Sequence, residues 1–120
     1  MGITTDLTAS ILAAAGVQVP GEVTLDGVNL LPILEGNRPV SERTLFWRST
    51  PGNRTMHAVR RGDYKLVIDA NHLLLFNVRT DPGERTDLAR EGTDVARDLR
   101  LELDAWEKDV DAEAARRTMR

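Results

Sequence analysis

The side chains that could take part in chemistry are few and widely spaced in this sequence of 120 residues. Cysteine is absent, which excludes disulfides, thiolate metal sites and cysteine nucleophiles. The two histidines, His57 and His72, belong to no cluster of histidines and carboxylates with metal-ligand spacing. His57 is predicted to be a half-buried strand residue beside Val59, and His72 an exposed residue at a hairpin tip. No metal site and no catalytic constellation is therefore predicted in this chain.

Composition and charge exclude two further classes of partner. Sixteen Lys and Arg against nineteen Asp and Glu give a net charge of −3, and no basic stripe typical of a nucleic-acid binder is visible. The apolar run from Ile11 to Ala15 is far shorter than the roughly 20 residues that span a bilayer. It follows Asp6 instead of a cationic segment, so it does not resemble a signal peptide. A signal in a longer parent chain would lie upstream, and the compartment stays open.

Helices are predicted at both ends of the chain. Oxygen-bearing residues Thr4 to Asp6 precede an apolar pattern that ends at Gly16, which predicts a helix over about 5–15. Leu30–Leu34 is predicted to form one or two helical turns capped by Asn29. A long helix is expected from Thr86 or Thr93 to about 117, with acidic and basic residues such as Glu102 on a solvated face. Its narrow apolar stripe consists of Val95, Leu99, Leu103, Trp106 and Val110.

Four strands are predicted between these helices. The candidates are Thr44–Arg48, Met56–Arg61, Tyr64–Asp69 and Leu73–Val78. Hairpin-sized gaps separate the last three, and they contain residues that accept a positive φ. In the third strand, Tyr64, Leu66 and Ile68 share one side. We therefore predict an α+β fold: an antiparallel sheet of about four strands, packed by the long C-terminal helix and preceded by one or two short helices.

Five segments, in order, resemble the C-terminal part of sulfatases of the alkaline-phosphatase superfamily. Residues 6–16, DLTASILAAAG, are similar to their D-L-x-x-T-l-l-x-x-A-G helix, and residues 25–34, LDGVNLLPIL, to L-D-G-x-S-L-L-P-L-L. Residues 45–47, LFW, match the strand that opens the small C-terminal sheet. Residues 58–66, AVRRGDYKL, resemble A-V-R-x-G-x-W-K-L, and residues 75–88 resemble L-Y-D-L…D-P-x-E…N-L. Each string alone is weak, but together and in order they are specific.

The resemblance implies chemistry that this chain lacks. Sulfatases of this kind use a formylglycine, made from Cys or Ser in a C/S-x-P-x-R motif, and a divalent cation such as calcium. Negative charge on the sulfuryl oxygens and the leaving group needs such stabilisation. Ser49 to Arg54 reads S-x-P-x-x-R, one residue too long, with Asn53 in place of the arginine. No helical pattern follows, so we interpret these residues as a loop and expect the chain to hold neither cofactor.

The resemblance also predicts a division of the chain. Residues 1–40 would be a helical segment of the large sulfatase domain, and residues 41–120 the C-terminal subdomain. The predicted function is that of a C-terminal part of a sulfuric ester hydrolase, structural and cleft-lining but not catalytic alone. Two alternatives stay open: a stand-alone interaction or oligomerisation module, and the corresponding part of a related phosphonate or phosphodiester hydrolase.

Partners and cleft residues are further expectations. The main partner would be the N-terminal catalytic domain, and apolar faces at 7–15 and 30–34 would otherwise favour a homo-oligomer. In many relatives a histidine follows the LFW strand, but Ser49 stands there in this chain. His57, with Arg54 or Arg48, is the alternative group that could face the substrate cleft. Arg60, Lys65 and Glu84 are expected to form ion pairs between sheet and turn.

Overall fold

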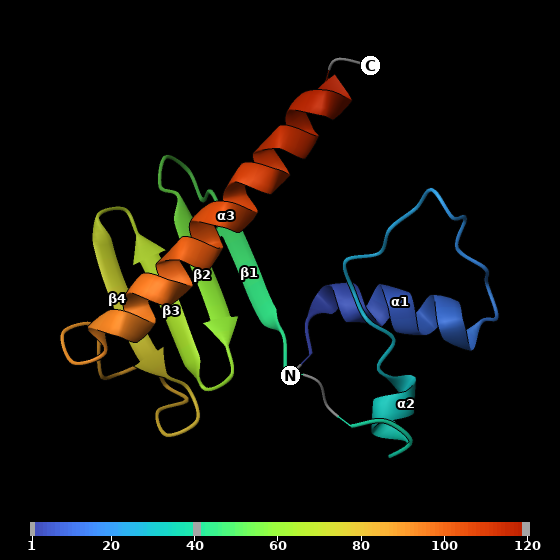
Figure 1. The fold of residues 1–120 in the computed structure, drawn as a ribbon, viewed down its shortest axis with the longest axis horizontal. Coiled ribbons are helices and arrows are strands. Elements are labelled where there is room, and N and C mark those ends of the chain that lie inside the picture. Colours follow the sequence, from blue (N-terminus) through green and yellow to red (C-terminus); the bar gives the residue numbers. More distant parts are fainter. Residues whose placement is uncertain (1, 40–41, 119–120) are drawn as a thin grey trace. The chain divides into compact units, whose positions relative to one another are not determined.

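The computed structural model describes residues 2–39 and 42–118. It divides the chain into two compact units, Met1–Ser41 and Glu42–Arg120, and each is described by itself. The predicted α+β class is confirmed: a four-stranded antiparallel sheet, a long C-terminal helix and two short helices make up the fold (Figure 1). No helix within the described ranges has the length and hydropathy to span a membrane.

The first unit contains α1, Thr4–Ala14, and α2, Leu31–Leu34. Asp6 organises this unit, because its fully buried carboxylate accepts backbone hydrogen bonds from two separate segments. The N–H of Ile3 donates to Oδ2 at 2.8 Å, and the N–H of Val28 donates to Oδ1 at 2.9 Å. The first bond closes the start of α1, where helical N–H groups have no partner of their own. The second ties α1 to a loop 22 residues away.

Ser10 and Gly27 complete the connection between α1 and the loop. The Ser10 hydroxyl donates to the backbone oxygen of Asp6 at 2.6 Å and accepts from the N–H of Leu30 at 2.9 Å. A Cβ at Gly27 would lie 2.1 Å from the backbone oxygen of Thr5, so only glycine fits there. Because these are backbone contacts, neither partner can move aside as a flexible side chain would.

The apolar residues of this unit are mostly exposed. Leu7 is 57% exposed, Ile11 65% and Leu34 77%, whereas Asp6 and Ala9 are the residues of α1 that are buried. The first unit is therefore held by hydrogen bonds to a carboxylate and a hydroxyl more than by an apolar core.

The second unit begins with an antiparallel meander in the order β1-β2-β3-β4. The strands are β1, Thr44–Ser49; β2, Met56–Arg61; β3, Tyr64–Asp69; and β4, His72–Asn77. Two-residue turns join the last three. Gly62 has a φ of 57°, and Ala70 adopts nearly the same left-handed conformation at 52°, which costs a non-glycine residue roughly 1–2 kcal/mol.

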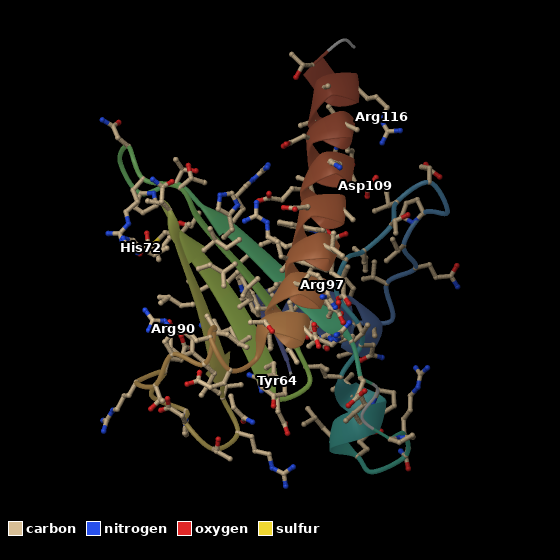
Figure 2. The ribbon with its side chains drawn as sticks, turned by 60° about the vertical axis from the view of Figure 1, so that its left-hand side comes forward. Tyr64, His72, Arg90, Arg97, Asp109 and Arg116 are labelled. Atoms are coloured by element: carbon tan, nitrogen blue, oxygen red, sulfur yellow. The ribbon has the colours of Figure 1, made fainter. Side chains whose placement is uncertain are left out.

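Helix α3, Thr93–Thr118, covers one face of the sheet (Figure 1). Leu99 and Leu103 are completely buried and pack with Val59, Leu66 and Leu75 of the strands. Phe46 and Trp106 stack at the edge of this core, with ring centroids 5.2 Å apart and planes inclined by 6°. The predicted apolar stripe is thus the face that meets the sheet up to Trp106. Beyond Val110 every described residue of α3 is exposed, and Arg116 lies on this distal part of the helix (Figure 2).

The segment between β4 and α3 runs back along the edge of the sheet. The N–H of Leu75 donates to Asp87 Oδ1 at 3.0 Å, and the N–H of Leu88 donates to the Leu75 oxygen at 2.7 Å. Residues 87 and 88 therefore satisfy both backbone groups of Leu75 on the outer edge of β4. Earlier in the segment, Asp81 Oδ2 accepts the N–H groups of Arg85 and Thr86 at 2.7 and 2.8 Å, as expected of an acidic turn residue.

Candidate functional site

A groove of about 670 Å³ lies on the face of the sheet opposite α3. Strand alternation places residues two apart on the same face, and the β1–β2 register pairs Trp47 with Ala58 and Ser49 with Met56. Trp47, Met56, Ala58, Arg60, Lys65 and Val67 line the groove from three strands. Val78, Pro82 and Glu84 line it from the segment that follows β4.

The charged residues of the groove are only partly matched. Lys65 Nζ lies 2.6 Å from Glu84 Oε1, which confirms the expected ion pair between sheet and turn. Glu84 holds this position with a φ of 52°. Arg60 donates from Nε to the backbone oxygen of Gly62 at 3.4 Å, a long bond. No carboxylate within residues 2–39 and 42–118 forms an ion pair with it, so the groove carries one unmatched cation.

The predicted cleft residues Arg48 and His57 lie on the other face of the sheet, against α3. They are cross-strand neighbours in the β1–β2 register. Arg48 Nη1 is 2.8 Å from Asp111 Oδ1, and His57 Nδ1 forms an ion-pair contact with Glu107. His57 also touches the groove and a second cavity of about 350 Å³ on the α3 side. The half-buried strand position predicted for His57 is observed, with its side chain 24% exposed.

Arg54 is separated from that pair. It lies in the β1–β2 loop and forms a two-pronged hydrogen bond with Asp69, at the end of β3. This hydrogen bond holds the pKa of Asp69 below its usual range and raises the pKa of Arg54. The structure thus brings Arg48 and His57 together and places Arg54 elsewhere. His72 is exposed at the β3–β4 turn, at the opposite end of the sheet from Tyr64 (Figure 2).

Residues 50–54 form a loop, as the sequence predicted, and Ser49 belongs to the strand before it. Ser49 ends β1, and the N–H of Arg54 donates to the Pro51 oxygen at 3.2 Å in a turn. The serine is therefore not at the start of a helix. No group of three or more metal-ligating side chains is arranged to hold an ion anywhere in the described ranges. The residues present do not fit a formylglycine or the cation that accompanies it, and we derive no step through either.

The acidic residues of α3 are the main feature that the sequence did not reveal. Glu102 was expected on a solvated face. Its side chain is 32% exposed, and it also accepts from the Thr44 hydroxyl at 3.0 Å and pairs with Arg61. Glu107 pairs with His57, and Asp111 forms an ion pair with Arg48. The three carboxylates flank the buried stripe of the helix and each reaches a basic side chain of β1 or β2. They were recognisable only once the strand face opposite them was known.

Comparison with known proteins finds relatives that share part of their length with this chain. No protein-family model matches the chain. Bovine (Bos taurus) arylsulfatase A is 34% identical in an alignment 116 positions long that covers 76% of this chain and 23% of the relative. The solved structure of a 2-O GAG sulfatase, BT1596, is 26% identical with a TM-score of 0.68, covering 87% of this chain and 24% of that chain.

A further solved structure agrees in fold and extent. Ps i-CgsB, crystallised with a k-i-k-neocarrahexaose, is 25% identical with a TM-score of 0.71, covering 84% of this chain and 23% of that chain. The chain thus spans about a quarter of the length of the relatives it matches. Together with the order of the matched segments, this shows that the chain is similar to the C-terminal portion of sulfatases of the arylsulfatase type.

Proposed function

We propose that this chain acts as the C-terminal subdomain of a sulfuric ester hydrolase, where it supports the catalytic domain and lines one side of the substrate cleft without being catalytic alone. The observation that carries the proposal is the 34% identity to a segment that makes up 23% of arylsulfatase A. Sulfuryl transfer needs a nucleophile and charge stabilisation held at fixed geometry. In this proposal both come from the rest of the enzyme.

The exposed residues of α1 and α2 support a place within a larger body. Leu7, Ile11 and Leu34 are all more than half exposed, and apolar side chains on short helices usually pack against something. We infer that residues 1–40 belong with the large domain and residues 41–120 form the subdomain proper. The ion pairs between α3 and strands β1 and β2 would then stabilise the subdomain internally.

Cleft lining by His57, Arg54 and Arg48 is the finer part of the proposal. Arg48 and His57 are neighbours in the β1–β2 register, and each has a carboxylate partner on α3. To contact a substrate directly, either side chain would have to leave its partner. Alternatively, the ion pairs would hold the backbone of β1 and β2 in place beside the cleft. In an enzyme that carries this subdomain together with the catalytic domain, His57→Ala should lower turnover of a sulfate ester. Unchanged turnover would remove His57 from the cleft.

The direct test of the main proposal is an assay of the purified chain. With an aryl sulfate as substrate, in the presence and absence of Ca²⁺ or Mg²⁺, we expect no turnover above the uncatalysed rate. Turnover by the 120-residue chain would refute a purely supporting role.

Self-association is a second candidate role, and the exposure of Leu7, Ile11 and Leu34 favours it. Sedimentation at rising protein concentration should then reveal an oligomer, and Ile11→Lys should shift it towards the monomer. A monomer at every concentration would speak against an oligomerisation module.

A further inference from the structure

The C-terminal half of α3 is attached to the sheet mainly through charged side chains. Trp106 is the last residue of the helix that packs against the buried apolar cluster. Beyond it, two ion pairs between described residues connect the helix to the strands: Glu107 contacts His57 of β2, and Asp111 contacts Arg48 of β1. The attachment of this part of α3 therefore depends on the charge of its partners.

The contact between His57 and Glu107 is the one whose charge can change near neutral pH. A neutral imidazole can donate a hydrogen bond from Nδ1 to the carboxylate, whereas a protonated imidazole adds the attraction of opposite charges. Histidine is the side chain that ordinarily changes its charge between about pH 5 and 8. The side chains of His57 and Glu107 are only 24% and 21% exposed, so salt screens their attraction less than it screens a surface pair.

The other charged groups beside this contact are already matched. Two ion pairs flank it, Arg48–Asp111 and Arg100–Asp104, and Arg100 lines the same cavity as His57 and Glu107. A neutral imidazole leaves Glu107 without a cation in this group. A protonated imidazole brings the group into charge balance.

The strands on the other side of His57 add no competing partner. Its neighbours across the sheet are the apolar Ile68 of β3 and, next to it, Leu73 of β4. At the end of β3, Asp69 is bound by Arg54. Glu107 is therefore the carboxylate that responds to the charge of the ring.

We propose that His57 and Glu107 form a pH-sensitive clasp, which fastens residues 107–118 of α3 to the sheet more firmly below neutral pH than above it. The direction follows because folding brings the charged ring against Glu107, and unfolding separates them. The contribution is present at the acidic end of the window between about pH 5 and 8 and is lost as the ring becomes neutral. This inference goes beyond the proposed function and does not depend on it.

The clasp has the opposite sign to the usual acid response. Carboxylates whose pKa is lowered by folding, such as Asp87, lose their contribution only below about pH 4. An attachment that becomes firmer between pH 8 and pH 5.5 is therefore not explained by these carboxylates.

Amide hydrogen exchange of the full chain at pH 5.5 and pH 8 tests the clasp. Rates are converted to protection factors, which removes the intrinsic pH dependence of exchange. Amides of residues 107–112 should be about two- to fivefold better protected at pH 5.5, as expected of a partly exposed ion pair. Amides of residues 97–103 should be equally protected at both pH values. Equal protection of residues 107–112, or greater protection at pH 8, would overturn the proposal.

Matched variants assign the effect to one ring. His57→Gln cannot gain a charge and Glu107→Gln removes the anion, so each should abolish the pH dependence. His57→Arg carries a permanent charge and should give the higher protection at both pH values. His72→Gln, at the exposed β3–β4 turn, is the control and should leave the pH dependence intact. A pH dependence that survives His57→Gln, or one that disappears in His72→Gln, would also overturn the clasp.

Discussion

Asp6 is a fully buried carboxylate whose two oxygens each accept a backbone N–H, from Ile3 and from Val28. Hydrogen bonds to an ionised group are among the stronger ones in proteins. The residues that match the sulfatase strings in this region, Asp6, Ser10 and Gly27, are therefore explained by the connection between α1 and the following loop. Their role is structural, although aspartate and serine are residue types that often take part in catalysis.

Gly27→Ala should disrupt this connection. The added Cβ would lie 2.1 Å from the Thr5 oxygen, and relief requires movement of the backbone at a cost of about 1–3 kcal/mol. Amide exchange should accelerate in 3–15 and 27–31. Gly21→Ala is the matched control, because no atom lies within 4 Å of a Cβ there. Equal exchange in the two variants would contradict the close approach.

Asp87 should make stability depend on pH. Hydrogen bonds from the N–H groups of Leu75 and Ala89 lower its pKa in the folded state. The folded chain therefore binds this proton at a lower pH than the unfolded chain, whose Asp titrates near about 3.9. The stabilisation is complete above that value and is lost as the pH falls through the folded pKa. Chemical denaturation from pH 7 to 2 should show a smaller loss for Asp87→Asn than for the parent chain.

At the scale of elements, the contact between α3 and the sheet stabilises the second unit. Leu99 is completely buried among strand residues, and Leu101, two positions along the same helix, is 61% exposed. Leu99→Ala should lower the free energy of unfolding by about 2–5 kcal/mol because it leaves a cavity in the core. Leu101→Ala should change it by no more than about 0.5 kcal/mol. Similar losses of unfolding free energy in the two variants would show that Leu99 is not on the buried side of the helix.

Sequence patterns predicted these elements because the relevant signals are local. Alternation in Tyr64–Asp69 grouped Tyr64, Leu66 and Ile68 on one side of the strand, and the stripe at Leu99 and Leu103 identified the buried side of the helix. The structure packs these two sides together. The pairing of Glu102, Glu107 and Asp111 with strand residues was not predictable in the same way. It depends on the rotation of α3 over the sheet, which tertiary packing sets. For the same reason His57 and Arg48 were proposed for a cleft before their partners were known.

At the scale of the whole chain, the two units have different sources of stability. All members of the apolar core cluster lie in Glu42–Arg120, whereas the first unit buries little besides Asp6 and Ala9. A chain that begins at Glu42 should therefore keep the sheet and α3. Its far-ultraviolet circular dichroism and cooperative thermal transition should persist. Loss of that transition would mean that the first unit supplies part of the core.

The resemblance in sequence predicted the family of the whole chain but not the groove on its surface. Ordered strings such as LDGVNLLPIL and AVRRGDYKL identified the family, and the comparison with arylsulfatase A bears this out. The groove was not predictable, because its residues come from three strands and a returning segment. The sequence also did not show that Arg60 lacks a carboxylate partner among the described residues, because Glu84 could have paired with either Arg60 or Lys65. In the structure Glu84 pairs with Lys65.

The two tryptophans of the chain are far apart in the sequence and lie on opposite sides of the sheet. Trp106, a residue of α3, stacks on Phe46 of β1, while Trp47 lines the groove and is 37% exposed. A version that retains Trp106 alone would report fluorescence changes when the helix separates from the strands. A version that retains Trp47 alone would shift its emission to the blue when another surface excludes water from the groove. The molecule thus carries two independent optical probes, one for the contact between the helix and the sheet and one for the exclusion of water from the groove.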